Sequence, residues 1–235
     1  MALPKITHPV FKINIPSTNK PVGFRPYTVK EEKLLMFMST AEDIEEVIET
    51  IKQVINNCCV DSINVDKLSM FDLEYIFIKL RSKSVGEILE LNYTINDEKY
   101  KFEVNLEDIE VKRDPNHKTR IILHNNIGAV MKYPSFATIL KLEKQYDEDS
   151  KNIDSAIFNI FTSCVENIFD DDKVYKEFTK EELDEFILSL PKKSFDVIKE
   201  FFDTMPVVEH RKTLKLKDGS NHEVVMRGLK DFFIF

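Results

Sequence analysis

The stretch SMFDLEYIFIKLRSKSVGEILELNYTINDEKYKFEVNL, residues 69–106, decides the fold class because its hydrophobic period changes from 3.6 residues to 2. Ser69 and Asp72 have the spacing of a capping box, so we expect a helix over 70–83. Apolar residues occupy two adjoining sides of this helix. A helix with so wide an apolar surface is either sandwiched between layers or covered by a partner.

A β-hairpin is predicted directly after this helix. Apolar and polar residues alternate along 89–95 and along 100–106, and Asn96-Asp97 supplies the turn between them. Further short segments are compatible with strands of the same central antiparallel sheet: 109–111, 120–124 and 128–131. A helix followed by antiparallel strands places the chain in the α+β class.

The N-terminal region is predicted to form another β-hairpin, with strands over 10–15 and 22–27 and a turn at 16–21. Residues 1–30 carry five basic side chains and no acidic one. This positive charge is either a solvated face or a surface that docks on an acidic partner. The second alternative is open because strand hairpins at chain ends often pair with another sheet edge.

Amphipathic helices are predicted to flank the sheet and to fill the C-terminal region. Apolar stripes and capping patterns place them at 30–38, 44–57, 135–146, 153–168, 183–190 and 195–205. Pro191 separates the last two, which gives a helical hairpin. A terminal β-hairpin over 212–217 and 222–227, with a turn at Asp218-Gly219, closes this helical block.

The domain organisation is expected to follow these elements. The α+β region, with its N-terminal hairpin and central sheet, covers 1–147, and the helical block with its terminal hairpin covers 148–235. The acidic stretch at 147–149 is the linker between them. The same pattern is also compatible with one continuous domain.

Composition argues against several classes of function. The 235 residues are 43% hydrophobic and 31% charged, with a net charge of −8, so no nucleic-acid partner is expected. The five glycines lack the spacing of a phosphate-binding loop, and no apolar run approaches the roughly 18 residues of a membrane span. Three cysteines, an odd number, argue against a disulfide framework and favour a reducing intracellular compartment.

No residue pattern predicts catalysis, a cofactor or a metal site. His210 and His222 lie twelve positions apart without a paired thiol, which disfavours zinc. The run 170–172 of three aspartates is interpreted as a solvated loop that ends a helix, since oxygen cages draw ligands from several elements. Cys164 lies on an apolar stripe, where burial raises the pKa of a thiol, and Ser84 lacks the flanking glycine of a nucleophile elbow. We therefore expect a non-enzymatic protein.

Two aromatic clusters are unusual because they lie near the ends of the chain, where chains commonly fray. One is Phe24-Arg25-Pro26-Tyr27 and the other includes Phe232 and Phe233. We expect Phe24, Tyr27, Phe232 and Phe233 to be packed, either against the body of the protein or in an interface with a partner.

Two long segments carry a family pattern. Residues 23–35, GFRPYTVKEEKLL, resemble the N-terminal signature of the tail baseplate protein family of T-even-type contractile-tailed bacteriophages. Residues 71–87, FDLEYIFIKLRSKSVGE, resemble its second signature. Tyr133-Pro134-Ser135 and the closing segment 228–233 are similar too, so the resemblance spans nearly the whole chain in order.

The resemblance implies a component of the baseplate hub, or a chaperone of hub assembly, made in the host cell cytoplasm. It implies partners among other hub or hub-assembly proteins and no catalytic residue or cofactor. The protein would either stay in the virion tail baseplate or act only during assembly, and a homo-oligomer is compatible with both. Some relatives carry Cys-x-x-Cys in the final hairpin, where Lys215 and Asp218 stand here, so a metal role of that motif would be lost.

Another class of function also fits the composition. An acidic chain with a basic N-terminal arm is compatible with a small phage regulatory or inhibitory protein that binds a host factor. Under either hypothesis the partner-binding residues are expected within the signatures and the chain ends. They are Phe24, Arg25, Pro26, Tyr27, Phe71, Tyr75, Arg81, Leu229, Phe232 and Phe233.

Overall fold

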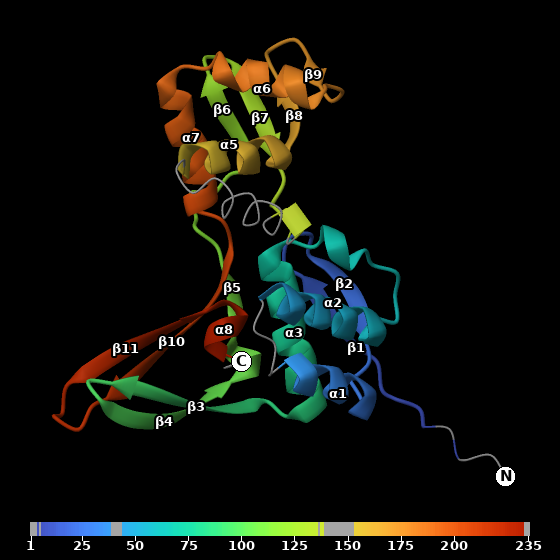
Figure 1. The fold of residues 1–235 in the computed structure, drawn as a ribbon, viewed down its shortest axis with the longest axis vertical. Helices are drawn as coiled ribbons and strands as arrows, with labels where there is room; N and C mark the ends of the chain where they lie inside the picture. Colours follow the sequence, from blue (N-terminus) through green and yellow to red (C-terminus); the bar gives the residue numbers. More distant parts are fainter. Residues whose placement is uncertain (1–3, 5, 39–43, 136, 139–152, 233–235) are drawn as a thin grey trace. The chain divides into compact units, whose positions relative to one another are not determined.

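Figure 1 shows the fold of the computed structural model, which describes residues 4, 6–38, 44–135, 137–138 and 153–232. Two predictions fall mainly or wholly outside these described residues. They are the helix over 135–146 and the domain boundary at 147–148. Both therefore stay predictions.

Contacts between Cα atoms divide the chain into two compact units. The first unit is formed by Met1–Lys112 together with Val207–Phe235, and the second unit is formed by Arg113–Pro206. Both ends of the chain thus belong to the first unit, and the second unit lies between them in sequence.

The first unit combines helices with short antiparallel strands. In chain order its elements are β1 (Phe11–Ile15), β2 (Lys20–Phe24), α1 (Val29–Met38), α2 (Ile44–Cys58), the 3₁₀ helix η1 (Val65–Lys67), α3 (Met70–Val85), β3 (Ile88–Ile95), β4 (Glu98–Asn105), the 3₁₀ helix η2 (Leu106–Asp108), β5 (Glu110–Lys112), β10 (Val207–Lys215), β11 (Asn221–Arg227) and α8 (Gly228–Phe232). The strands form three sheets, in the orders β1–β2, β3–β4 and β11–β10–β5.

Helix α3 is the central element of the first unit. Its predicted capping box is confirmed, because the Ser69 hydroxyl accepts the Asp72 N–H and the Asp72 carboxylate accepts the Ser69 N–H. Nine of its side chains are buried, and the helix contacts α2, α8, β1, β5 and β10. Of the two predicted alternatives, the structure therefore shows a helix sandwiched between other elements of its own chain.

The three predicted hairpins are all present in the first unit. Strands β1 and β2 pair from Phe11 with Phe24 onward, and β3 and β4 pair along their whole length. Asn96 and Asp97 have φ of 51° and 63°, the left-handed values that the two-residue turn between β3 and β4 requires. In the last hairpin Gly219, with φ of 86°, closes the turn between β10 and β11.

Segment 109–111 forms a strand, as predicted, but this strand does not share a sheet with β3 and β4. Strand β5 pairs instead with the start of β10, so that Val111 lies opposite Val208. The pairing partner lies nearly a hundred residues further along the chain. A local alternation of apolar residues identifies a strand but carries no information about so distant a partner.

The second unit has one sheet packed against helices. Its elements are β6 (Arg120–His124), β7 (Ile127–Met131), α5 (Ile153–Cys164), β8 (Val165–Phe169), β9 (Val174–Tyr175), α6 (Lys180–Leu188) and α7 (Lys192–Asp203). The strands are antiparallel in the order β6–β7–β8–β9. Side chains of α5, α6 and α7, among them Phe161, Leu183 and Phe201, pack with Leu123 and Met131 of the sheet into one core. The helical hairpin at Pro191 is confirmed.

The helix predicted over 153–168 is too long. Helix α5 ends at Cys164, and the chain continues directly into strand β8. Ile168 fits the helical stripe, but in the structure it pairs with Ala129 of β7 on one side and Tyr175 of β9 on the other. Pairing with a strand on each side provides hydrogen-bond partners for the backbone of this segment. These tertiary contacts outweigh the helical spacing of its apolar residues. The run 170–172 accordingly joins two strands and does not end a helix.

The α+β class is confirmed, while the expected central sheet is divided. The predicted strands lie in separate small antiparallel sheets, and β3–β4 and β6–β7 even belong to different units. The terminal hairpin β10–β11 groups with the first unit through β5 and α8, although it follows the helical block in sequence.

Candidate partner-binding site

The first signature segment forms a buried polar network at the end of β2. The Arg25 guanidinium donates to Glu31 Oε1 at 3.0 Å, to the Asn57 carbonyl at 3.0 Å and to the Pro26 carbonyl at 2.9 Å. The network therefore ties together β2, the start of α1 and the end of α2. Arg25 is the only one of the two ion-pair partners with access to solvent, because Glu31 is fully buried.

Glu31 keeps its charge despite this burial. Desolvation alone would raise the pKa of Glu31, but hydrogen bonds from Arg25 and from the Thr28 N–H and hydroxyl outweigh it and lower the pKa to about 2. The Thr28 N–H and hydroxyl donate at 2.8 Å and 2.7 Å, so Thr28 and Glu31 also secure the first turn of α1.

Tyr27 joins the first signature segment to the second. Its N–H donates to Ser84 Oγ at 2.9 Å, and Ser84 in turn donates to the Leu80 carbonyl at 2.6 Å. Burial raises the pKa of the Tyr27 hydroxyl to about 12, and the positive charge of Arg81 partly opposes that rise. Tyr27, Ser84 and Arg81 thus lie together at the C-terminal half of α3.

The described part of the closing segment, helix α8 (Gly228–Phe232), meets α3 at a different point. Glu74, which is almost fully buried, accepts a hydrogen bond from the Leu229 N–H, and burial raises its pKa to about 7. A Cβ on Gly228 would lie 2.8 Å from Glu74 Oε1, and the backbone φ of 65° at this position is one that favours glycine. The first signature segment and the closing segment therefore both contact α3, which the second signature segment forms.

Four of the expected partner-binding side chains are buried inside the first unit. Phe24, Phe71, Leu229 and Phe232 are between 0% and 6% exposed. Internal packing is thus observed for Phe24 and Phe232, while Phe233 lies outside the described residues. In this structure these four side chains belong to the packed interior of the first unit, and their role in partner binding stays a prediction.

The other expected residues are partly exposed. Arg25, Pro26, Tyr27, Tyr75 and Arg81 are all intermediate in exposure. Tyr75 faces η2, since the ammonium of Lys79 lies 5.4 Å from its ring centroid and donates to the Leu106 and Glu107 carbonyls. It is therefore not part of the cluster around Tyr27. A role of these five residues in partner binding stays a prediction.

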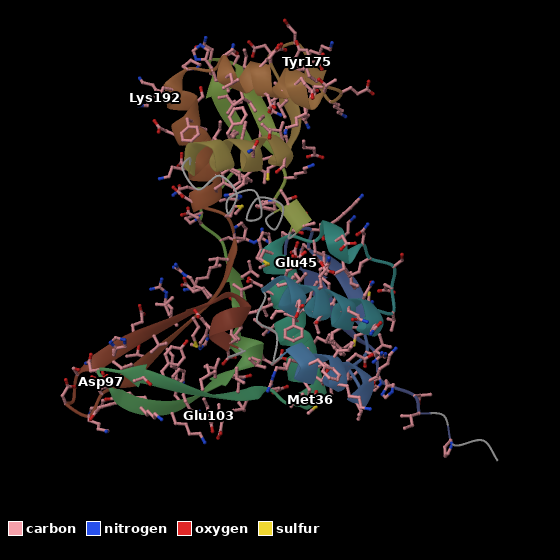
Figure 2. The ribbon with its side chains drawn as sticks, viewed as in Figure 1. Met36, Glu45, Asp97, Glu103, Tyr175 and Lys192 are labelled. Carbon is pink, nitrogen blue, oxygen red and sulfur yellow. The ribbon has the colours of Figure 1, made fainter. Side chains whose placement is uncertain are left out.

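Exposed apolar side chains on α1 escaped the sequence analysis. Val29, Met36 and Phe37 are 75%, 66% and 75% exposed, and Figure 2 labels Met36 on this helix. The signal lay in 34–38, where five successive residues are apolar. Successive helical residues point in different directions, so such a run cannot be buried on one side.

A second buried carboxylate holds the sheet β11–β10–β5 together. Glu209 accepts hydrogen bonds from Lys112, Arg211 and Arg227, each at 2.7 Å, and these three cations come from the three different strands. The hydrogen bond from Lys112 is the main cause of a pKa for Glu209 of about 2, with Arg211 and Arg227 adding to it against the effect of burial. This cluster is an interstrand clamp.

The cysteine thiols and the aspartates at 170–172 lie in surroundings that serve packing and turn formation. Cys58, Cys59 and Cys164 are free thiols, and burial raises the pKa of Cys58 to about 12 and that of Cys164 to about 11. At neutral pH these two thiols are protonated and weakly nucleophilic. Asp170 accepts the N–H groups of Asp172 and Lys173, which makes a tight turn between β8 and β9.

The two histidines of the last hairpin lie far from each other. His210 lies opposite Met226 and His222 opposite Leu214, four steps apart along the hairpin and thus separated by roughly 13 Å. Among the described residues no group of three or more His, Cys, Asp or Glu side chains could hold a metal ion. None of the helices described is long and apolar enough to cross a membrane.

Comparison with known proteins identifies the class. A family model described as T4 bacteriophage base plate protein matches residues 8–234, nearly the whole chain. The protein is thus a phage baseplate protein. More particularly, the chain belongs to the T4 bacteriophage base plate protein family, as its signatures implied. No curated protein and no solved structure matches it.

Proposed function

We propose that this protein is a non-enzymatic component of the baseplate hub, or a chaperone of hub assembly, that acts through contacts with other phage structural proteins. Its site of action is the host cell cytoplasm during assembly, and the completed tail baseplate if the protein is retained. The observation that carries the proposal is the family match over residues 8–234.

The use of the signature residues supports a role in binding rather than catalysis. Their polar side chains are engaged within the first unit, as in the hydrogen bonds of Glu31 with Arg25 and Thr28 and of Ser84 with Tyr27. What these segments build is a rigid scaffold around α3. A scaffold of this kind presents its exposed surface, including Met36 and Phe37 on α1, to other proteins.

Co-expression tests the proposal. The full chain, carrying an affinity tag, is expressed together with each hub and hub-assembly protein of the same phage, and complexes are measured by size-exclusion chromatography with light scattering. We expect one or more defined complexes. A chain that stays uncomplexed with every hub protein would contradict the proposal.

Matched variants locate the contact surface. Phe37→Ser and Leu188→Ser each remove an apolar side chain that is 75% exposed on a helix, one in each unit. If α1 contributes to the interface, Phe37→Ser weakens the complex and Leu188→Ser leaves it intact. If both variants bind equally well, Phe37 and its helix α1 are not part of the interface. The proposed function would not be affected by that result.

The class of partner is tested separately. If the protein were instead a regulator of a host factor, a tagged chain in uninfected cells would retain one host protein in stoichiometric amount. We expect stoichiometric partners only when phage proteins are present. Quantitative mass spectrometry of purified particles then distinguishes a retained hub component from an assembly chaperone, which would be absent from them.

A further inference from the structure

The second unit contains an apolar cavity of about 310 Å³ between its sheet and α6. Tyr175, Phe178, Leu183 and Phe186 contribute to its walls, and Figure 2 labels Tyr175 at this end of the unit. The volume lies at the lower limit of ligand pockets, which bind drug-sized molecules at roughly 300–1,000 Å³. It therefore suits one or two apolar side chains of a docked peptide segment.

The cavity has an acidic border. Asp170 and Glu182 are the two carboxylates that line it. Asp170 accepts the Tyr175 hydroxyl at 2.8 Å and Glu182 accepts the Thr179 N–H at 2.8 Å, so both are held in place as acceptors. Residues 166–185 carry nine acidic side chains against three lysines.

Two cations lie beside aromatic side chains of its walls. The ammonium of Lys173 is 4.9 Å from the Tyr175 ring centroid, and the Arg120 guanidinium is 3.4 Å from the Phe169 ring centroid. The nine carboxylates within 166–185 still outnumber Arg120 and the three lysines of this segment. An occupant of the cavity should therefore be apolar where it enters and basic around the point of entry.

The chain itself contains a segment of this kind. The N-terminal arm, residues 6–10, precedes β1, and its Ile6 and Val10 are 80% and 58% exposed. Lys5 and Lys12 flank this arm in sequence, and residues 1–30 carry no acidic side chain. Pro9 favours an extended backbone, the conformation in which a short peptide can lie along a groove.

We propose that the cavity of the second unit binds the N-terminal arm of another copy of this chain. The arm and the cavity are different surfaces, so the contact is head-to-tail. In a dimer, one copy keeps an unbound arm and the other keeps an empty cavity, so further copies can add. The charges of the two surfaces are opposite, and each leaves apolar groups uncovered in the single chain. This self-association goes beyond the proposed hub function, which stands whether or not the arm docks.

Sedimentation velocity of the full chain over a range of concentrations measures this association. We expect the weight-average mass to rise with concentration. The double variant Ile6→Ser/Val10→Ser should weaken association ten- to a hundredfold, because two apolar side chains lose their burial. The control Val85→Ser/Ile88→Ser removes side chains of 58% and 53% exposure from elsewhere in the first unit and should associate like the wild type.

Charge is tested by the double variant Asp170→Asn/Glu182→Gln. These amides keep an oxygen acceptor for Tyr175 and Thr179 but remove two negative charges. We expect association to weaken about tenfold at low salt, with little difference between variant and wild type at 1 M salt, where charges are screened. An equal loss at both salt concentrations would contradict charge complementarity.

Complementation shows whether the contact is head-to-tail. Ile127→Trp fills the cavity from its own wall, so this chain keeps an intact arm, whereas Ile6→Ser/Val10→Ser keeps an intact cavity. Each variant alone should be monomeric, and a mixture of the two should form dimers that grow no further. Because recovery in the mixture requires both chains to be folded, misfolding cannot imitate this result.

Crosslinking identifies the copy that supplies the arm. In a Cys59→Ser background, Val10→Cys is paired with Val174→Cys on β9, or with the similarly exposed Ile122→Cys on β6 as a control. We expect disulfide-linked dimers with Val174→Cys and few with Ile122→Cys. A monomeric wild type, a mixture that stays monomeric, or crosslinks formed only within one chain would each overturn the proposal.

Discussion

Buried carboxylates dominate the behaviour of this protein at the scale of single residues. Glu31 and Glu209 are charged and surrounded by cations or hydrogen-bond donors, whereas Glu74 faces an apolar environment and one backbone N–H. The first two have pKa values of about 2 and the third has a pKa of about 7. Similar side chains in similar degrees of burial thus respond to pH in opposite directions.

Removal of Glu31 should uncouple β2, α1 and α2. We expect Glu31→Ala to lower the free energy of unfolding by about 2–4 kcal/mol, because it leaves Arg25 and Thr28 without their acceptor. Glu32→Ala, at the next position and exposed, should change it by less than about 0.5 kcal/mol. Urea denaturation followed by circular dichroism measures both, and equal effects would contradict the network described here.

Glu74 should make the protein less stable as pH rises through neutrality. Its folded-state pKa of about 7 lies above the ordinary value near 4.5, so the stability it contributes is complete below pH 4.5 and is lost as pH rises through 7. Between pH 5 and pH 8 the wild type should lose on the order of 2–3 kcal/mol from this group. Glu74→Gln should remove most of that loss, and an unchanged pH dependence in this variant would refute the assignment.

Acid pH should act through the other two carboxylates. The folded-state pKa values of Glu31 and Glu209 lie below their ordinary values, so their contributions are present above about pH 4.5 and are lost as pH falls toward 2. Below pH 4.5 the variant Glu209→Gln should therefore lose stability less steeply than the wild type in thermal unfolding. Identical slopes would show that the three cations of the clamp do not stabilise the charged form.

At the scale of elements, the two aromatic positions Phe232 and Phe37 should behave in opposite ways. Phe232 of α8 is 1% exposed and Phe37 of α1 is 75% exposed. We expect Phe232→Ala to lower the free energy of unfolding by about 3–5 kcal/mol and Phe37→Ala to leave it nearly unchanged. Differential scanning calorimetry compares the two, and a stable Phe232→Ala variant would show that α8 does not complete the core.

The packing of β7 on β8 depends on Gly128. A Cβ at this position would lie 2.3 Å from Phe169 Cζ and 2.4 Å from the Ile121 carbonyl oxygen. Since backbone cannot move aside as easily as a side chain, Gly128→Ala should cost about 3 kcal/mol or more. Gly23→Ala meets first a Val60 methyl at 2.8 Å and should cost less, so a reversed order in chemical denaturation would contradict the described packing.

Local patterns predicted individual elements well. Alternation along 89–106 and the Asn96-Asp97 turn determined a hairpin and its register, because the turn and the two strands are adjacent in sequence. Segment 165–169 was misassigned because its apolar spacing fits a helix and a strand equally, and its strand neighbours include β7, far upstream. The residues expected to bind a partner include four that are buried and five that are partly exposed, since composition does not reveal which aromatic side chains the fold covers.

At the scale of the whole molecule, the grouping of distant segments could not be read from the sequence. Strand β10 pairs with β5, although the whole second unit lies between these strands in sequence. The first unit is therefore built from two separate stretches of the chain. A composition change along the chain does not reveal which distant segments pack together. The family resemblance did extend over the whole chain, and the match over residues 8–234 confirms it.

We propose that this baseplate protein works by binding hub proteins. Affinity purification of the tagged full chain from infected cells, with quantitative mass spectrometry of what it retains, tests this most directly. We expect one or more hub or hub-assembly proteins in stoichiometric amount, and the same partners with the control variant Leu188→Ser. Recovery of the chain alone, or with a host protein as its only stoichiometric partner, would contradict it.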